Sequence, residues 1–360
     1  MKTGRSGEID VLRFLFALTI MAYHMCSAFK KGYIRHGYIG VEFFFVVTGY
    51  LAARHIASRK RKDPDYPANS DIPSETWQFI LRKIGQFYRY FICAGLLKFI
   101  VFFIIRERHT LAESLREIVH GIPVFTLTFL GLNTDRNVFY TRGMWYVSAM
   151  ILALIVLYPC MLYRFSFSTR WLFPVISVIL LRYMYTTYGT IARYNVGTGF
   201  ADAGVIRAIA EIAAGASLFA LSEWFSGKYR HLLESPSLFT KLCLTLAKLF
   251  CFGVVFVYAR GTFQGEKIPR SDDIYIFLVC LIGIFLCFSQ VGFCIPDGKV
   301  TRWLGKASTA VYFFHGVLQG ILTSLVPTKG VSPQRFALYI AGIFIMSLAL
   351  QWGVDLVHKK

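Results

Sequence analysis

The first long apolar stretch of the chain, residues 9–29, contains three ionisable side chains, Asp10, Arg13 and His24. Arg13 and His24 are eleven residues apart. On a helix they would therefore share one face and lie about 16 Å apart along the axis. Asp10 precedes Arg13 by one turn, within reach of an ion pair. Such a helix presents a charged pair near one end and an imidazole near the other. The structural alternatives are extension of Asp10 and Arg13 toward the lipid headgroups, and a packed, hydrogen-bonded His24.

Glu42 is the acidic residue of the next apolar stretch, residues 38–57. If the two stretches form antiparallel helices, Glu42 lies at a depth comparable with that of His24. A carboxylate bonded to one imidazole nitrogen fixes the tautomer and makes the other nitrogen a better base. We therefore predict a His24–Glu42 pair that can take a proton from a hydroxyl nucleophile.

Later apolar stretches hold further candidates, each with a structural alternative. Arg207 and Glu211 are four residues apart, which favours a structural ion pair within one helix. His315 is either a second active-site group or a core histidine. Trp145 and Tyr146 are candidate substrate contacts, although aromatic residues at this height also form the interfacial belt. No metal site is expected, because no HExxH pair occurs in a usable context. A GxSxG elbow and a phosphate-binding loop are missing from the sequence as well.

The composition indicates the environment in which these residues work. Of the 360 residues, 56% are hydrophobic and 16% are charged, and the chain has 34 Phe, 20 Tyr and 6 Trp. An average soluble domain has about 25% charged and 45–50% apolar residues, so this chain would expose too much apolar surface in water. The same figures exclude a disordered chain, a coiled coil and a disulfide scaffold. They predict a multi-spanning membrane protein, in which a charge at mid-depth costs about 2.5–3.5 kcal/mol and is a functional candidate by default.

Apolar stretches of about 20 residues, long enough to cross a bilayer, recur along the whole chain. They predict an all-α polytopic integral membrane protein, a single bundle of about ten transmembrane helices that occupies residues 1–360 as one domain. A shorter apolar piece, Ile122 to Leu132, is typical of a re-entrant or interfacial segment. The predicted spans are residues 9–29, 38–57, 87–105, 144–164, 171–189, 204–225, 239–259, 273–294, 307–326 and, as the last transmembrane helix, 334–356.

The charge balance, 39 Lys and Arg against 20 Asp and Glu for a net charge of +19, would indicate nucleic-acid binding in a soluble protein. In a membrane protein it reflects basic cytoplasmic loops, and no nucleic-acid partner is expected. The densest basic run, residues 59–62, lies in the polar segment 58–77, which we predict to be a cytoplasmic loop. With an even number of spans, both termini are then cytoplasmic. Residues 79–89 carry one apolar and one basic face, as an interfacial helix does.

Four sequence blocks resemble those of the acyltransferase-3 family of integral membrane acyltransferases. Arg13 and His24 match the family's Arg-x10-His signature. Residues 40–50 are similar to its second helix, which reads Gly-Val-(Asp/Glu)-x-Phe-Phe-x-x-Ser-Gly. Residues 145–148, Trp-Tyr-Val-Ser, resemble its Trp-Tyr-Leu-Ser block, and residues 304–315 resemble its late Leu-Gly-x-x-Ser…Tyr-x-x-His block. The four blocks stand in family order and cover most of the chain.

The chain departs from the family pattern in two places. Of the cytoplasmic Arg-x-x-Arg motif, Arg82 and Lys83 are present, but Gln86 stands where the second Arg is expected, and Arg89 follows one turn later. The Glu that often follows the Trp-Tyr-x-Ser block is absent, since Ala149 and its neighbours occupy that region. The second departure places the chain nearer the branch found with capsule and exopolysaccharide genes.

The resemblance implies an O-acetyltransferase of the bacterial inner membrane. It would move an acetyl group from cytoplasmic acetyl-CoA to a sugar hydroxyl of a cell-surface glycan, an exopolysaccharide or its lipid-linked precursor. His24 would be the general base or a transient acyl carrier, and Glu42 its orienting partner. Arg13, held by Asp10, would anchor the donor side. Succinyl or longer acyl groups stay open.

The resemblance also implies contacts and partners. The basic residues Arg82, Lys83 and Arg89 would give the coenzyme A phosphates a positive approach. The acceptor, a glycan or lipid-linked sugar, would contact the aromatic and imidazole groups at positions 145, 146 and 315. The bilayer and separate glycan-assembly proteins are the other expected partners. The rival interpretation is a transporter or flippase for a glycolipid or anionic substrate, in which Arg13, His24 and Glu42 line a pathway.

Overall fold

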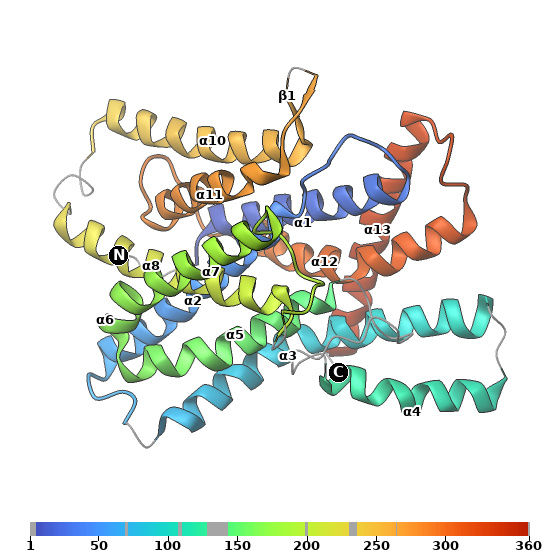
Figure 1. The fold of residues 1–360 in the computed structure, drawn as a ribbon, viewed down its shortest axis with the longest axis horizontal. Coiled ribbons are helices and arrows are strands. Elements are labelled where there is room, and N and C mark those ends of the chain that lie inside the picture. The colour runs from blue at the N-terminus through green and yellow to red at the C-terminus, as the bar shows by residue number, and fades with distance from the viewer. Residues whose placement is uncertain are drawn as a thin grey trace.

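The computed structural model describes residues 5–68, 71–106, 110–127, 143–198, 201–229, 236–263 and 265–358. Nearly all regular structure in these ranges is helical, and nine of the described helices are long and apolar enough to cross a membrane. The chain is therefore an all-α, multi-pass membrane protein, as predicted (Figure 1).

The elements follow one another from the N-terminal to the C-terminal end as labelled in Figure 1. They are α1 (Gly7–Ala28), α2 (Ile39–Lys62), α3 (Ile72–Lys98), the π-helix η2 (Phe99–Arg106), α4 (Leu111–Leu127), α5 (Met144–Tyr163), α6 (Phe165–Phe167), the π-helix η4 (Ser168–Leu172), α7 (Phe173–Tyr188), α8 (Ala203–Lys228), α10 (Leu238–Arg260), the antiparallel hairpin β1 (Thr262–Phe263) and β2 (Glu266–Lys267), the 3-10 turn η5 (Arg270–Asp272), α11 (Asp273–Phe288), α12 (Lys299–Leu325) and α13 (Pro333–His358).

The second and third helices are longer than their apolar stretches. α3 joins the predicted interfacial helix 79–89 to the predicted span 87–105 and continues directly into η2. α2 runs through its basic residues to Lys62, so the segment between the two helices is residues 63–71 rather than 58–77. The cause is local, because Lys and Arg are good helix formers and the proline in the first turn of α3 fits a helix start.

Two other boundaries depend on features that the apolar pattern does not contain. α11 stops at Phe288, short of the predicted residue 294, because Gln290 and Gly292 have φ angles of 53° and 71° that no helix accepts. The predicted piece Ile122 to Leu132 begins inside α4, and its residues from 128 onward lie outside the described ranges.

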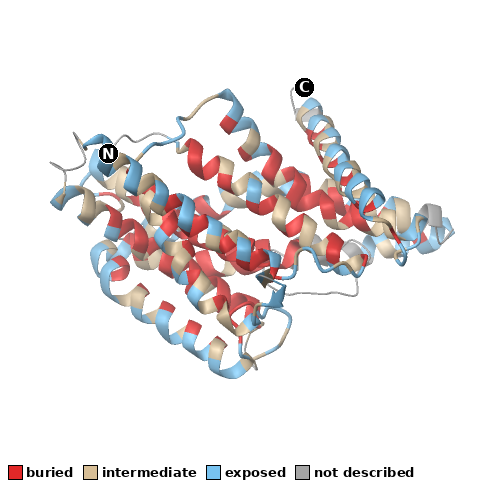
Figure 2. Ribbon diagram, turned by 90° about the horizontal axis from the view of Figure 1, so that it is seen from above, coloured by how far each residue is buried: buried red, intermediate tan, exposed pale blue. Residues whose placement is uncertain are grey.

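α12 contains the predicted span 307–326 but is not among the nine apolar helices. Its buried residues include the polar side chains of Ser308, His315 and Gln319. A helix can carry such groups at membrane depth when protein rather than lipid surrounds it. In Figure 2 the buried residues gather on the inner helices, whereas the outward faces of the peripheral helices are exposed.

Two glycines bring α2 and α8 into backbone contact. A Cβ on Gly49 would collide with the carbonyl of Ile212, and a Cβ on Gly215 would collide with that of Val46. Small residues permit such close crossings in membranes, where helix association depends on packing. The crossing fixes the register of the two helices. Glu42, two turns before Gly49, is thereby placed beside the first turns of α8.

Candidate active site

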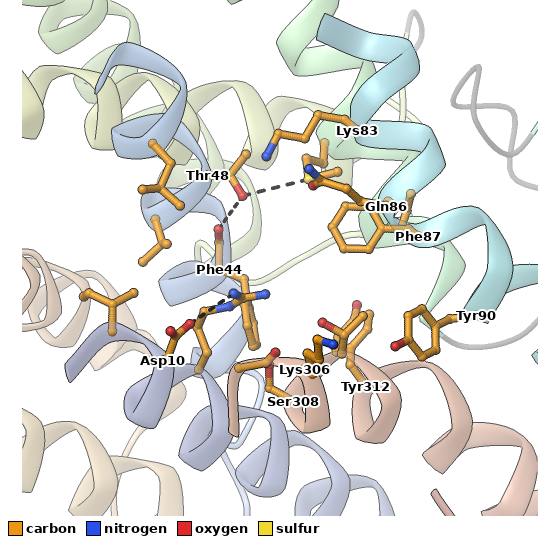
Figure 3. Close-up of a pocket in the computed structure, with 18 of the residues that line it drawn as sticks. Asp10, Phe44, Thr48, Lys83, Gln86, Phe87, Tyr90, Lys306, Ser308 and Tyr312 are labelled. Carbon is orange, nitrogen blue, oxygen red and sulfur yellow. Dashed lines mark hydrogen bonds and ion pairs between the residues drawn. The ribbon is translucent and has the colours of Figure 1, made fainter. Parts of the chain in front are cut away.

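A cavity of about 640 Å³ lies between α1, α2, α3, α5 and α12, and we call it the cationic cavity. Figure 3 shows Lys83 on its α3 wall and Lys306 on its α12 wall. The described residues that line it include more basic than acidic side chains. The basic ones are Arg5, Arg13, Arg54, Lys83, Arg89 and Lys306, and the acidic ones are Asp10 and Asp355.

Asp10 organises the α1 side of the cationic cavity. Its Oδ1 accepts a hydrogen bond from Nη2 of Arg5 at 3.0 Å and lies 3.5 Å from Nη1 of Arg13, so the ion pair expected between Asp10 and Arg13 is present. A Cβ on Gly305 would lie 2.5 Å from the same oxygen. The glycine of the late sequence block therefore lets α12 approach the carboxylate that holds both arginines.

Two of the three residues predicted to contact the donor line the cationic cavity. Lys83 and Arg89 do so, whereas Arg82 is exposed and is not part of the lining. Lys83, Arg89 and Lys306 make no ion pair with any residue in the described ranges, so their charges are available to an anion. No motif or spacing in the sequence singled out Lys306 or Arg54, which are basic residues on helices that reach the cavity from other directions.

A second cavity, of about 300 Å³, lies near the other end of α1, and we call it the histidine cavity. The rings of His24 and His315 both line it, stacked with centroids 5.2 Å apart and planes 20° apart. No carboxylate occurs among its described lining residues. The lining is instead aromatic and basic, with Tyr23, Tyr38, Trp145, Tyr194, Tyr312, Arg207 and Arg270.

One hydrogen bond sets the tautomer of the His315 ring, and another holds the backbone of His24. Nδ1 of His315 lies 3.0 Å from the carbonyl oxygen of Val311. Because a carbonyl only accepts, Nδ1 donates and Nε2 is the basic nitrogen of the neutral ring. Nε2 of Gln319 donates to the carbonyl of His24 at 3.0 Å, which joins α12 to α1 beside the stacked rings. The sequence named His315 as a second active-site group or a core histidine, without pairing it with His24.

The carboxylate of Glu42 pairs with Arg207, at 2.6 Å between Oε1 and Nη2. Nε of Arg207 also binds Oε1 of Glu211 at 3.0 Å, and all three side chains are at most 1% exposed. Arg207 lines the histidine cavity, and Glu42 stands behind it. The structure thus gives Glu42 an arginine partner on α8, where the sequence predicted a pair with His24.

A buried carboxylate supports the loop that holds Arg207. Asp273 accepts hydrogen bonds from the hydroxyl of Thr190 and from the backbone N–H of Ile191, the latter at 3.0 Å. The carbonyl of the next residue, Ala192, accepts a hydrogen bond from Nη1 of Arg207 at 3.2 Å. Asp273 therefore positions the guanidinium indirectly. The sequence placed Asp273 only at the start of a span.

The two cavities meet at Tyr312, which among the described lining residues is the one that belongs to both. The adjacent residues Trp145 and Tyr146 divide between them, Trp145 to the histidine cavity and Tyr146 to the cationic cavity. α1 likewise contributes Arg13 to the cationic cavity and His24 to the histidine cavity. The candidate site is therefore two chambers in sequence along the bundle.

Comparison with known proteins identifies the family of the chain. A family model described as an acyltransferase domain matches residues 6–354, nearly the whole chain. No curated protein and no solved structure matches the chain significantly. A match of this extent covers all four sequence blocks and every residue of both cavities except Arg5 and Asp355. The chain is a multi-pass membrane acyltransferase and belongs to the acyltransferase-3 family.

Proposed function

We propose that the protein transfers an acetyl group from cytoplasmic acetyl-CoA to a sugar hydroxyl of a cell-surface or exopolysaccharide glycan, or of its lipid-linked precursor, in a bacterial inner membrane. The observation that carries the proposal is the pair of chemically different cavities that meet at Tyr312. One is basic and suits a polyanionic donor. The other is aromatic, carries two stacked imidazoles and suits a neutral nucleophile.

Coenzyme A fits the cationic cavity by charge. It carries several phosphate charges, and Lys83, Arg89 and Lys306 offer cations without ion-pair partners among the described residues. Charge-assisted hydrogen bonds to phosphate are among the stronger polar contacts in proteins. The basic end of α2 continues the positive field outside the cavity, which would steer an anion toward it. We place this side of the bundle in the cytoplasm, where acetyl-CoA is supplied.

A sugar acceptor fits the histidine cavity. The rings of Trp145 and Tyr194 are stacked with centroids 4.5 Å apart and give the cavity an aromatic wall. Aromatic side chains provide apolar faces while their polar edges bind hydroxyl groups. Arg270, exposed and 4.6 Å above the ring of Tyr38, adds a charged donor at the rim. These groups surround the imidazole of His24, which would face the acceptor hydroxyl.

Two routes use His24 as the reacting group. In the direct route, His24 takes the proton of the sugar hydroxyl while the hydroxyl oxygen attacks the thioester carbon; the carbon–sulfur bond breaks and the thiolate takes the proton. In the covalent route, an imidazole nitrogen attacks the thioester first, and the departing sulfur takes the ring proton. The sugar oxygen then displaces the imidazole and returns a proton to it.

The test is His24→Asn in a deletion strain of the native host. We expect O-acetyl groups in the purified surface glycan, measured by proton NMR, to fall at least about 100-fold, because general acid–base catalysis contributes about 10²–10⁴-fold. His55→Asn is the matched control, since His55 lines neither cavity. Unchanged acetylation at equal protein level would contradict the role of His24.

Release of free coenzyme A separates the acyltransferase from the transporter. Inverted membrane vesicles expose the cytoplasmic face and retain endogenous acceptors. The proposal requires that vesicles with the wild-type protein release coenzyme A from added acetyl-CoA as glycan becomes acetylated. A flippase would instead move glycolipid without consuming thioester. Protein-bound radiolabel from acetyl-CoA in acceptor-depleted vesicles would favour the covalent route over the direct one.

A further inference from the structure

The side chain of Tyr312 lies between the cationic and histidine cavities and lines both. Its ring packs against Phe44 and Tyr146 on one side, with centroids 6.0 and 5.5 Å away, and against His315 on the other, at 6.1 Å. Its hydroxyl donates to the carbonyl of Gly143 at 3.3 Å, a long bond. Phe44 and Tyr146 line only the cationic cavity, and His315 lines only the histidine cavity.

The order of residues along α12 places this ring on the route of transfer. Lys306 and Ser308 line the cationic cavity, Tyr312 lines both cavities, and His315 lines the histidine cavity. From residue 306 to residue 315 a helix rises about 14 Å. An acyl group that moves along α12 from Lys306 toward the stacked imidazoles therefore passes Tyr312.

The space beside the ring is narrow. A Cβ on Gly143 would lie 3.1 Å from Cε1 of Tyr312, so the ring occupies room that any other residue at position 143 would restrict. Rotation about the Cα–Cβ bond of Tyr312 would move the ring while the backbone of α12 stays in place. The opening that results is limited by the fixed aromatic neighbours Phe44 and Tyr146.

We propose that Tyr312 is the specificity-determining residue for the acyl group, since its ring sets the size of the group that can pass from the thioester to His24. This role rests on the proposed function. In the step it governs, the acyl carbon leaves the coenzyme A sulfur and bonds either to an imidazole nitrogen of His24 or to the acceptor oxygen. The sulfur takes the proton that the nucleophile gives up. A two-carbon acyl group passes the ring, whereas a four-carbon group is retarded.

The experiment compares acetyl-CoA with butyryl-CoA in inverted membrane vesicles from the deletion strain, which carry endogenous acceptors. The readout is the ratio of butyryl to acetyl incorporation into glycan, with coenzyme A release measured in parallel. For Tyr312→Ala we expect the ratio to rise about 10-fold or more, because each methylene that a pocket must admit is discriminated by about 10–200-fold. For Tyr312→Phe we expect a ratio within about twofold of wild type, because phenylalanine keeps the ring that lies between the two cavities.

Two further variants keep the test decisive. Tyr312→Trp enlarges the ring and should lower acetyl transfer and abolish butyryl transfer, which is the opposite of the alanine variant. Tyr90→Ala is the matched control, because Tyr90 lines the cationic cavity alone and its ring packs against Phe313 and Phe314. It should leave the ratio within about twofold of wild type even if the KM for the donor changes.

The possible outcomes distinguish failure of the role of Tyr312 from failure of the proposed function. If Tyr312→Ala folds and transfers acetyl groups with an unchanged ratio, or if Tyr90→Ala raises the ratio equally, the role of Tyr312 is overturned while the proposed function stands. If Tyr312→Ala does not accumulate, the ratio of Tyr312→Trp decides, and an undiminished ratio overturns the role. If wild-type vesicles release no coenzyme A, the proposed function fails and the role of Tyr312 fails with it.

Discussion

The two cavities use charge in opposite ways. In the cationic cavity the basic side chains project into an open space, and Lys306 and Arg89 are exposed. In the wall of the histidine cavity Arg207 is sealed, since it pairs with Glu42 and Glu211 in a cluster that is at most 1% exposed. The first arrangement leaves charge available to a ligand. The second uses almost all of its charge within the protein.

Because of this difference, substitutions in the two regions should affect different properties, donor binding in one and folding in the other. A solvated cation contributes little to stability, because its ion pairs in water are worth about 0–1 kcal/mol. A buried charge that loses its partner is costly, at about 3–5 kcal/mol. Substitutions in the cationic cavity should therefore act on the KM of the donor, whereas substitutions of the buried ion cluster should act on the amount of folded protein. Stability and KM measurements on variants of the two regions should separate these effects.

The largest effect is expected for Arg207→Met. The substitution leaves the carboxylates of Glu42 and Glu211, both fully buried, without their cation. We expect the free energy of unfolding to fall by about 3–5 kcal/mol. The measurement is thermal unfolding of the purified protein in detergent, together with the yield of membrane-inserted protein. Adding Glu42→Gln and Glu211→Gln should recover much of the loss, since the buried negative charges are then gone.

Arg61→Met is the control for Arg207→Met. Arg61 also pairs with a glutamate, Glu223, at 3.3 Å, but both side chains are partly exposed, 49% and 32%. The change in stability should stay within about 1 kcal/mol. Equal losses for the two arginine variants would refute the contrast between sealed and open charge.

A smaller effect, on binding alone, is expected for Lys83→Gln and Lys306→Gln. Each removes one cation from the cationic cavity. A hydrogen bond to a charged group is worth about 1.5–3 kcal/mol, so the KM for acetyl-CoA should rise about 10-fold with kcat within about twofold of wild type. The difference from wild type should shrink as salt is added, because screening weakens both proteins' attraction for the donor.

Lys299→Gln is the matched control, because Lys299 begins the same helix as Lys306 but does not line the cavity. Its KM should equal that of wild type within about twofold. A loss of stability in either cavity variant as large as that of Arg207→Met would show that these cations are structural.

The sequence predicted the parts of this site that lie within one helix. The eleven-residue spacing of Arg13 and His24 predicted one face and two depths, and the two side chains do line cavities near opposite ends of α1. Asp10 pairs with Arg13 as its spacing indicated. Helical geometry is local and fixed, so spacing along one helix carries positional information.

Contacts between helices were not predictable in the same way. Glu42 and Arg207 are joined because Gly49 and Gly215 permit a backbone crossing of α2 with α8, and nothing in either helix alone specifies that partner. The length of α3 and the polar residues of α12 escaped the apolar pattern for a related reason. That pattern measures contact with lipid, whereas these segments extend beyond the apolar layer or pack against protein.

The smallest effect concerns His36, in the loop between α1 and α2, whose ring centroid lies 5.7 Å from that of Tyr38. Burial, reinforced by the positive charges of Arg270 and Arg35 and only partly offset by Asp272, lowers the pKa of His36 from 6.5 to about 4. The ring of His36 is therefore neutral between pH 5.5 and 8.5. His36→Gln should leave the midpoint of the pH–rate profile between pH 5.5 and 8.5 unchanged, so any titration seen there belongs to other groups. A midpoint displaced by more than about 0.5 unit would assign the titration to His36 instead.

The lowered pKa of His36 also makes the stability of the folded protein depend on pH. Below pH 6.5 the unfolded chain binds a proton at His36, whereas the folded chain does not until the pH approaches 4. Stability from this residue is therefore complete above pH 6.5 and is lost as the pH falls toward 4. At pH 5 the loss is at most about 2 kcal/mol, at 1.36 kcal/mol per pH unit. The melting temperature of His36→Gln should consequently fall less than that of wild type between pH 7 and pH 5. His36 should therefore affect folding alone, which a thermal melt detects while the midpoint of the pH–rate profile stays fixed.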